Sequence, residues 1–202
     1  AGLTAALSVQ RLEENNVSKE KGKVLVTGAT GGVGSFAVSI LSTLGYQVEA
    51  STGKESEQEY LQKLGATSIV SRDEVYDGKI RALGKQKWVA AVDPVGGEPL
   101  AALLSQIQYG GSVAVSGLTA GTKLPTTVFP FILRGVNLLG IDSVYCPMET
   151  RLKVWSRLAT DFKPANLEEL IQQEVTLEQL PEFLPTLLKG QARGRILVKL
   201  SL

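Results

Sequence analysis

The sequence predicts an α/β protein built on a doubly wound parallel sheet, and three observations lead to that class. Short apolar runs of strand type alternate with helical segments along the 202-residue chain, which is typical of repeated βαβ units. A glycine-rich turn joins the first of these runs to the helix that follows it. The composition, with 44% hydrophobic and 20% charged residues, is that of a folded chain able to bury one sizeable core.

In the first half of the chain, helices are expected where apolar residues recur every three or four positions. Strands are expected where short apolar runs lie between polar or glycine-containing turns. Phe36, Ile40 and Leu44 give helical spacing that stops at Gly45, a residue type favoured at helix ends. Helices in this half are expected at residues 1–14, 35–44 and 55–64. Strands are expected at residues 23–27, 46–51 and 67–71.

The same alternation continues in the second half of the chain. Strands are expected at residues 88–93, 111–116, 137–141 and 195–200. Helices are expected at residues 97–106, 128–134, 149–161 and 177–188. Because strands alternate with helices, the strands are expected to pair in parallel, with helices on both faces of the sheet. We assign residues 1–150 to the doubly wound domain and residues 151–202 to a C-terminal appendage.

The charge and the reactive side chains exclude several classes of function. The formal net charge is +1, which gives no electrostatic basis for binding nucleic acid or an anionic membrane. The chain has no histidine and a single cysteine, Cys146. This composition excludes an internal disulfide, a Ser-His-Asp or Cys-His catalytic group, and an ordinary zinc site.

Two stretches without charged residues, 24–48 and 99–122, are long enough to raise the question of membrane spans. Glycines interrupt both stretches, and both contain Thr, Ser or Gln, so buried strands and tight turns are expected instead. The chain does not open with a signal-peptide pattern, and we therefore expect a cytoplasmic location.

The glycine-rich turn is the sharpest local signal in the chain. It reads A-x-G-x-x-G at Ala29, Gly31 and Gly34, between an expected strand and an expected helix. Gly31 would let the backbone approach a pyrophosphate, and Gly34 would let the helix pack closely on the strand. The free N–H groups and the dipole at the helix start would then attract phosphate charge. The alternative is a turn that only packs a helix on a sheet; the strand-turn-helix context favours dinucleotide binding.

The end of the second expected strand indicates which dinucleotide is bound. NAD-specific sites usually place an acidic residue there, to hold the ribose 2′-hydroxyl. Here Glu49 comes two residues too early, and the tip is Ser51, Thr52, Gly53 and Lys54. Hydroxyls, a glycine amide and an ammonium suit a 2′-phosphate, and Arg72 beyond the third strand could join them. We favour NADP(H) over NAD(H); the alternative is a solvated turn and a surface arginine.

With these residues in view, the chain resembles the medium-chain dehydrogenase/reductase superfamily. Within it, the resemblance is to the zinc-free quinone oxidoreductase branch, which includes acrylyl-CoA reductases and the YhdH/YhfP type. Segments such as VTGATGGVG and AVDPVGG carry the likeness, and together they span essentially the whole chain. The matching segments are residues 1–6, 26–34, 51–54, 60–66, 91–97, 109–114, 130–136, 139–143 and 193–195.

The resemblance implies a Rossmann-type NADP(H) site, no metal, and a role for each of several residues. The pyrophosphate would lie on the turn, at Thr30, Gly31, Gly32, Val33 and Gly34. The 2′-phosphate would be held by Ser51, Thr52, Gly53, Lys54 and Arg72, with Lys54 standing where the family usually has arginine. The nicotinamide end would be lined by Gly117, Leu118, Thr119 and the segment after Asp93. Arg195 would reach the pyrophosphate, or would be a surface residue on an edge strand. Phe129, Phe131 and Ile132 would form an apolar wall near the nicotinamide, or ordinary core.

The resemblance also implies neighbours for this chain. Members of the family carry a GroES-like catalytic domain ahead of the point where this chain begins. Residues 151–202 would partly belong with that domain, so the last strand is expected to lack partners and to expose apolar surface. The strand at residues 137–141 resembles the edge through which the family forms two-fold dimers.

The function implied is hydride transfer from NADPH to an activated C=C bond or a quinone. The substrate would be an enone, a quinone or an acrylyl-CoA type of thioester. No proton donor can be named from these residues. Two alternatives remain: a non-catalytic NADP(H)-binding module, and a fragment of a zinc-type alcohol dehydrogenase.

Overall fold

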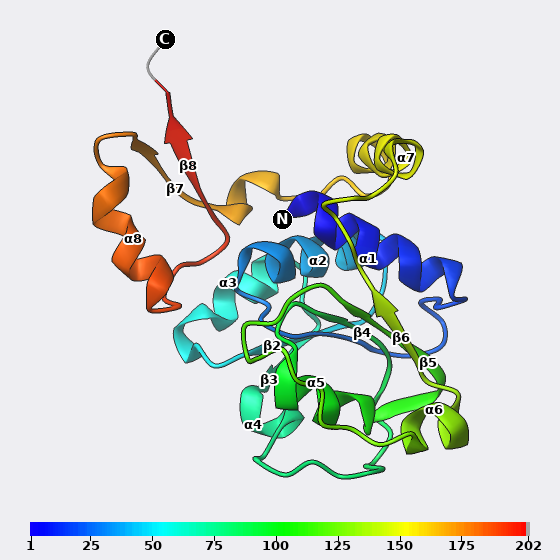
Figure 1. Ribbon diagram of the computed structural model, residues 1–202. Helices are drawn as coiled ribbons and strands as arrows, with labels where there is room; N and C mark the ends of the chain where they lie inside the picture. The colour runs from blue at the N-terminus through cyan, green and yellow to red at the C-terminus, as the bar shows by residue number, and fades with distance from the viewer. Residues whose placement is uncertain (201–202) are drawn as a thin grey trace.

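The computed structural model describes residues 1–200 and contains the doubly wound sheet that the sequence predicts (Figure 1). Six parallel strands lie in the order β3-β2-β1-β4-β5-β6. The order reverses between β1 and β4, and ligands bind at such a switch point in open parallel sheets. The strands are β1 Val24–Val26, β2 Val48–Thr52, β3 Ser68–Ser71, β4 Trp88–Asp93, β5 Ile107–Val115 and β6 Asn137–Gly140.

Helices cover both faces of this sheet (Figure 1). Neighbouring residues of β1 point to opposite faces: Val24 and Val26 join one buried apolar cluster, and Leu25 joins the other. The first face carries α1 Gly2–Glu14, α2 Gly32–Thr43, α3 Gln58–Lys63 after the short η1 Glu55–Glu57, and α7 Met148–Ala159. The second face carries α4 Arg72–Val75, α5 Gly97–Leu104 and α6 Phe129–Arg134.

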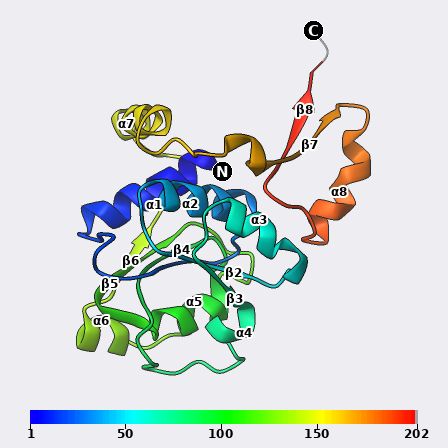
Figure 2. The ribbon, with the colours of Figure 1, turned by 180° about the vertical axis from the view of Figure 1, so that it is seen from behind.

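The C-terminal unit, which we define as residues 167–200, extends away from the main sheet (Figure 2). Its β7 and β8 form a separate two-stranded parallel sheet, joined by α8. The expectation that the last strand lacks partners is therefore wrong: β8 pairs with β7, a strand whose polar sequence IQQEVT gave no apolar pattern to read. Its elements are η2 Leu167–Leu170, β7 Ile171–Thr176, α8 Leu180–Leu188 and β8 Arg195–Lys199. Exposed apolar side chains, as expected, are present there: Leu177, Leu184, Leu187, Leu188, Leu197 and Leu200.

Three further elements differ from the sequence-based expectation. Helix α2 begins at Gly32 rather than at residue 35, because the turn already closes with a hydrogen bond from Gly31 N to Gly28 O (2.9 Å). Helix α4 was not predicted, although Ser71 and Glu74 form a capping box at its start. Strand β5 begins at Ile107 and continues through an irregularity in its pairing with β4.

The described part of the chain contains no helix long and apolar enough to cross a membrane. The uncharged stretch at residues 24–48 folds as β1, the glycine-rich turn, α2 and the start of β2, as the glycines in it indicate. Within residues 1–200, no group of three or more His, Cys, Asp or Glu side chains lies close enough together to hold a metal ion.

Candidate functional site

A cavity of about 860 Å³ lies where the strand order reverses, at the carboxyl ends of the central strands. The loops after β1, β2, β3, β4 and β5 line it, and residues of the C-terminal unit form a further wall. Most of the residues predicted from the sequence meet here. Those lining the cavity are Thr30, Gly31, Gly32, Val33, Ser51, Lys54, Arg72, Gly117, Thr119 and Arg195.

The glycine-rich turn holds the start of α2 tightly against β1. Gly28 has a φ of +52°, a conformation that glycine adopts at little cost. A Cβ on Gly34 would lie 2.3 Å from Gly28 O, so the close packing predicted for this glycine is present. Helix α2 has no side-chain cap and no acidic residue in its first turn. Its first N–H groups are therefore left to bind an anion in the cavity.

Two cations lie side by side at the rim of the cavity. The Arg72 guanidinium lies over Gly53, where an added Cβ would be 2.7 Å from Nε. Burial lowers the pKa of Lys54, and the charge of Arg72 lowers it further, against the opposing charge of Glu57. Thr52 is buried behind the rim, and its Oγ1 accepts a hydrogen bond from Lys54 N (3.0 Å). Thr52 and Gly53 thus shape the rim, while Lys54 and Arg72 supply its charge.

Glu49 is held away from this rim, at the other end of β2. Its carboxylate accepts hydrogen bonds from Lys23 Nζ (2.6 Å), Trp88 Nε1 (2.7 Å) and Ser68 Oγ (3.1 Å). Burial raises the pKa of Glu49, but the hydrogen bonds from Lys23 and Trp88 outweigh this effect and hold the pKa below its ordinary value. Strand β2 therefore presents no carboxylate at the place where an NAD-specific site usually has one.

The Asp93 carboxylate fastens together the loops after β1 and β4, a role that the sequence did not reveal. This fully buried carboxylate accepts hydrogen bonds from Thr27 Oγ1 (2.5 Å) and Gly96 N (2.7 Å). Burial raises the pKa of Asp93, with the hydrogen bonds from Thr27 and Gly96 opposing. A Cβ on Gly117 would lie 2.1 Å from Pro94 O, so the neighbouring loops pack backbone to backbone. The AVDPVGG segment predicted that this loop belongs to the site. It did not predict that the Asp93 carboxylate holds the loop in place.

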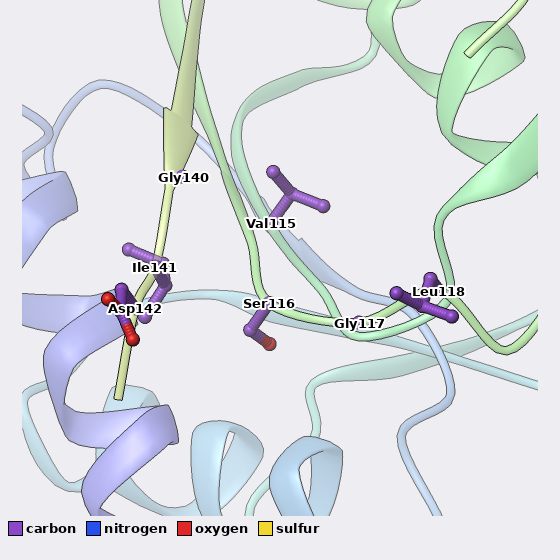
Figure 3. Close-up of a pocket in the computed structure, with 7 residues that line it drawn as sticks. All are labelled: Val115, Ser116, Gly117, Leu118, Gly140, Ile141 and Asp142. Carbon is purple, nitrogen blue, oxygen red and sulfur yellow. The ribbon is translucent and has the colours of Figure 1, made fainter. Parts of the chain in front are cut away.

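A second cavity of about 510 Å³ lies at the ends of β5 and β6 (Figure 3). It shares Ser116 and Gly117 with the first cavity, so the two cavities are neighbours at the end of β5. Leu118 lines this second cavity and is largely exposed. The remaining lining residues are Val115, Gly140, Ile141 and Asp142.

Residues 189–194, which we call the strap, connect α8 to β8, and Gly190, Ala192 and Gly194 line the first cavity. Gly194 N donates to Thr30 O (2.9 Å), and Lys54 Nζ donates to Ala192 O (2.7 Å). The chain then runs into Arg195, which lies against the turn: a Cβ on Gly32 would be 2.6 Å from Nη1 of Arg195. Arg195 is thus an exposed residue of β8 that also faces the cavity.

The structure does not place the apolar wall at either cavity, and the core role that was the alternative holds for Phe131. Phe129, Phe131 and Ile132 line neither cavity, and Phe131 packs against the apolar cluster of the second sheet face. Helical spacing placed these residues on α6, which lies away from the carboxyl ends of the central strands. Val95 lines the cavity in the segment after Asp93, as predicted, whereas other lining residues gave no signal in the sequence: Asp73, Val75, Tyr76, Pro99 and Leu187.

Comparison with known proteins agrees with this geometry. The profile of the zinc-binding dehydrogenase family matches residues 32–160. The chain belongs to the zinc-binding dehydrogenase family. This family lies within the medium-chain dehydrogenase/reductase superfamily that the sequence resembles, so that resemblance is confirmed.

Relatives of the zinc-binding dehydrogenase family match nearly all of this chain. YhfP of Bacillus subtilis, provisionally named a quinone oxidoreductase, is 60% identical over 99% of the chain. The structure of YhfP with NAD bound matches with a TM-score of 0.95, covering 98% of this chain and 60% of YhfP. Acrylyl-CoA reductase AcuI of Ruegeria pomeroyi is 50% identical over 100% of the chain.

A further solved structure contains the phosphorylated dinucleotide. YhdH of Escherichia coli K-12 with bound NADPH is 46% identical and has a TM-score of 0.94, covering 99% of this chain and 61% of YhdH. The chain spans 61% of the length of YhfP and of AcuI.

Proposed function

We propose that this chain binds NADP(H) in the first cavity and forms the cofactor-binding part of a reductase. One observation carries the proposal: the uncapped start of α2 opens into a cavity whose rim holds Lys54 and Arg72. A helix N-terminus suits a pyrophosphate, and a pair of cations beyond it suits a further phosphate. The glycines let the turn pack closely: an added Cβ would lie 2.3 Å from Gly28 O at Gly34 and 2.6 Å from Arg195 Nη1 at Gly32.

The predicted residues that line the two cavities each contact one part of the nucleotide in the proposed site. The amides of residues 30–33 and the Arg195 guanidinium hold the pyrophosphate. The Ser51 hydroxyl, the Lys54 ammonium and the Arg72 guanidinium hold the 2′-phosphate. Gly117, Leu118 and Thr119 lie at the nicotinamide end, where the two cavities meet.

The proposed reaction is reduction of an activated C=C bond or a quinone. Bound NADPH supplies the hydride. The chain's own residues orient the cofactor and, at the second cavity, form one wall of the space beside it. The names of the quinone oxidoreductase and acrylyl-CoA reductase relatives support a quinone or an acrylyl thioester as substrate. The alternative of a non-catalytic NADP(H)-binding module predicts binding without turnover.

A titration with NADPH and NADH tests the proposal. We expect at least a ten-fold preference for NADPH, which corresponds to about 1.4 kcal/mol. We expect Lys54→Ala to remove most of that preference, because one of the two rim cations is lost. Equal affinity, or a preference for NADH, would contradict the assignment of the rim. The result could go against the proposal, because the structure of the similar protein YhfP contains NAD, the dinucleotide without the 2′-phosphate.

The proposal includes a homodimer formed through β6. This strand pairs with β5 and is the edge of the six-stranded sheet, so its outer backbone groups can pair with a second copy. The ladder with β5 runs from Asn137 to Gly140, and Ile141 N donates to Val115 O beyond it. Sedimentation should give the mass of a dimer, whereas a monomer at all concentrations would contradict this assembly. The proposed location is the cytoplasm, which cell fractionation tests.

A further inference from the structure

Arg193 belongs to the strap, but it does not line either cavity. Its guanidinium stacks on the Tyr60 ring, with Cζ 4.6 Å from the ring centroid. Its Nη1 lies 3.3 Å from Glu57 Oε2, in an ion pair whose side chains are 35% and 19% exposed. Its backbone N donates to Gln172 Oε1 on β7 (2.8 Å). Arg193 thus connects α3, η1, β7 and the strap at one point.

Glu57 is a potential competitor at the 2′-phosphate rim. It follows Lys54 by one short turn, in which Glu57 N donates to Lys54 O (3.1 Å). Burial lowers the pKa of Lys54, and the charge of the Glu57 carboxylate opposes that shift. A carboxylate at this position attracts the cation that should bind phosphate, and it repels the phosphate itself.

We propose that Arg193 is a specificity-determining positioning residue: by pairing with Glu57 and fixing the strap, it keeps Lys54 available for a 2′-phosphate. This inference rests on the proposed function, and it adds a residue that does not touch the nucleotide. The strap contributes directly, because the Ala192 carbonyl accepts a hydrogen bond from Lys54 Nζ (2.7 Å) and holds the ammonium at the cavity.

Removal of Arg193 has a definite electrostatic consequence. Glu57 is mostly buried, and a desolvated carboxylate without a partner is costly. Lys54, whose charge already interacts with that of Glu57, is the cation it can recruit. The ammonium is then drawn from the rim into an ion pair, and the strap loses its contacts with Tyr60 and Glu57. NADPH loses a rim cation, whereas NADH, which lacks the 2′-phosphate, does not depend on that cation.

The experiment measures the dissociation constants of NADPH and NADH for the complete chain by fluorescence titration. Arg193→Ala should lower the NADPH-over-NADH preference by five-fold or more. Adding Glu57→Gln should restore most of that preference, because the competing charge is gone. In a Lys54→Ala background, Arg193→Ala should change the preference by less than two-fold, since the two residues act through one another. Lys189→Ala, which removes an exposed cation from the same strap, is the matched control and should leave the preference unchanged.

The outcomes separate this inference from the proposed function. If the unmodified chain shows no preference for NADPH, the assignment of the rim fails and the role of Arg193 fails with it. If the unmodified chain prefers NADPH and Arg193→Ala keeps that preference, only the inference is overturned. A lost preference that Glu57→Gln does not restore also overturns it, because Arg193 would then act only as structural support.

Discussion

The sheet body and the C-terminal unit are held together by different interactions. In the body, the central strands and α2 place side chains such as Val26 and Ile40 in apolar clusters with no solvent exposure. In the C-terminal unit, α8 has no buried residue, and only Leu170 and Val175 are buried among the apolar side chains. Leu170 joins an apolar cluster of the body, and the strap adds polar contacts such as the hydrogen bond from Gly194 N to Thr30 O. One wall of the cavity therefore rests on many buried contacts and the other on few.

A glycine in each region shows what this difference means. Gly34 in the body and Gly194 in the strap each approach a backbone oxygen so closely that an added Cβ would lie 2.3 Å from it. The oxygen belongs to Gly28 in the first case and to Leu170 in the second. The same clash should cost more in the tightly packed sheet body than inside the C-terminal unit, where few side chains are buried.

The largest effect is expected from Gly34→Ala. The new methyl group would meet Gly28 O and, at 2.7 Å, Ala29 Cα, and neither is a flexible side chain that could turn aside. We expect a loss of about 3 kcal/mol in the free energy of unfolding, measured with urea, together with loss of nucleotide binding. Gly140→Ala is the stability control, because no atom lies within 4 Å of its added Cβ. A loss below about 1 kcal/mol would show that α2 can shift, and the contrast between the regions would weaken.

Asp93→Ala should come next, with a loss of about 2 kcal/mol. The substitution leaves the Thr27 hydroxyl and the Gly96 amide without their buried acceptor. We also expect weaker NADPH binding, because Asp93 fixes the loop that carries Pro94 and Val95 at the cavity. Urea unfolding and a nucleotide titration measure the two effects. Unchanged stability would mean that the loops after β1 and β4 keep their positions without this carboxylate.

A comparison of the unmodified chain with Asp93→Asn tests whether burial dominates at Asp93, because the difference in their stability should depend on pH. Because burial raises the pKa of Asp93 in the folded protein, the native state holds its proton more tightly than the unfolded state. Below the ordinary value of 3.8 the carboxyl is protonated in both states, so its ionisation costs nothing there. As the pH rises through the native pKa, the unmodified chain should lose stability relative to Asp93→Asn, and the difference should then level off. A relative gain over this range would mean that the hydrogen bonds outweigh burial.

Gly194→Ala should have a smaller global effect, of about 1 kcal/mol, from strain at its φ of +50°. The local effect should be larger: the strap would lift from Thr30, and the amides of β8 should exchange hydrogen faster than those of β1. Hydrogen exchange followed by mass spectrometry measures both strands in one experiment. Equal protection of β8 in both proteins would contradict the view that the strap fastens the C-terminal unit.

The sequence predicted the regions that local patterns specify. The parallel pairing of the six strands follows from alternation, and the turn at Gly31 and Gly34 follows from backbone geometry, whereas the order of the strands comes from the structure alone. Contacts between distant segments left no such pattern. The sequence does not distinguish Asp93 from other carboxylates at strand ends, because its partner Thr27 comes from a distant strand. Residues 171–176 form β7 by pairing with β8, which α8 brings alongside. The hydrogen bond from Lys54 to the strap carbonyl of Ala192 joins residues 138 positions apart, and no local sequence pattern can predict it.

The smallest effect is expected from Leu188→Glu, on the exposed side of α8. Leu188 is 89% exposed, so the substitution removes no buried contact, and the free energy of unfolding should change by less than about 0.5 kcal/mol. The exposed leucines of the C-terminal unit should nevertheless promote association, and the added charge should reduce it. Urea unfolding and light scattering at increasing protein concentration measure the two effects. A loss above about 2 kcal/mol would show that another part of the protein covers this side of α8, because only a buried leucine stabilises by that much. The C-terminal unit would then be as firmly packed as the sheet body, and the proposed contrast between the two walls of the cavity would no longer hold.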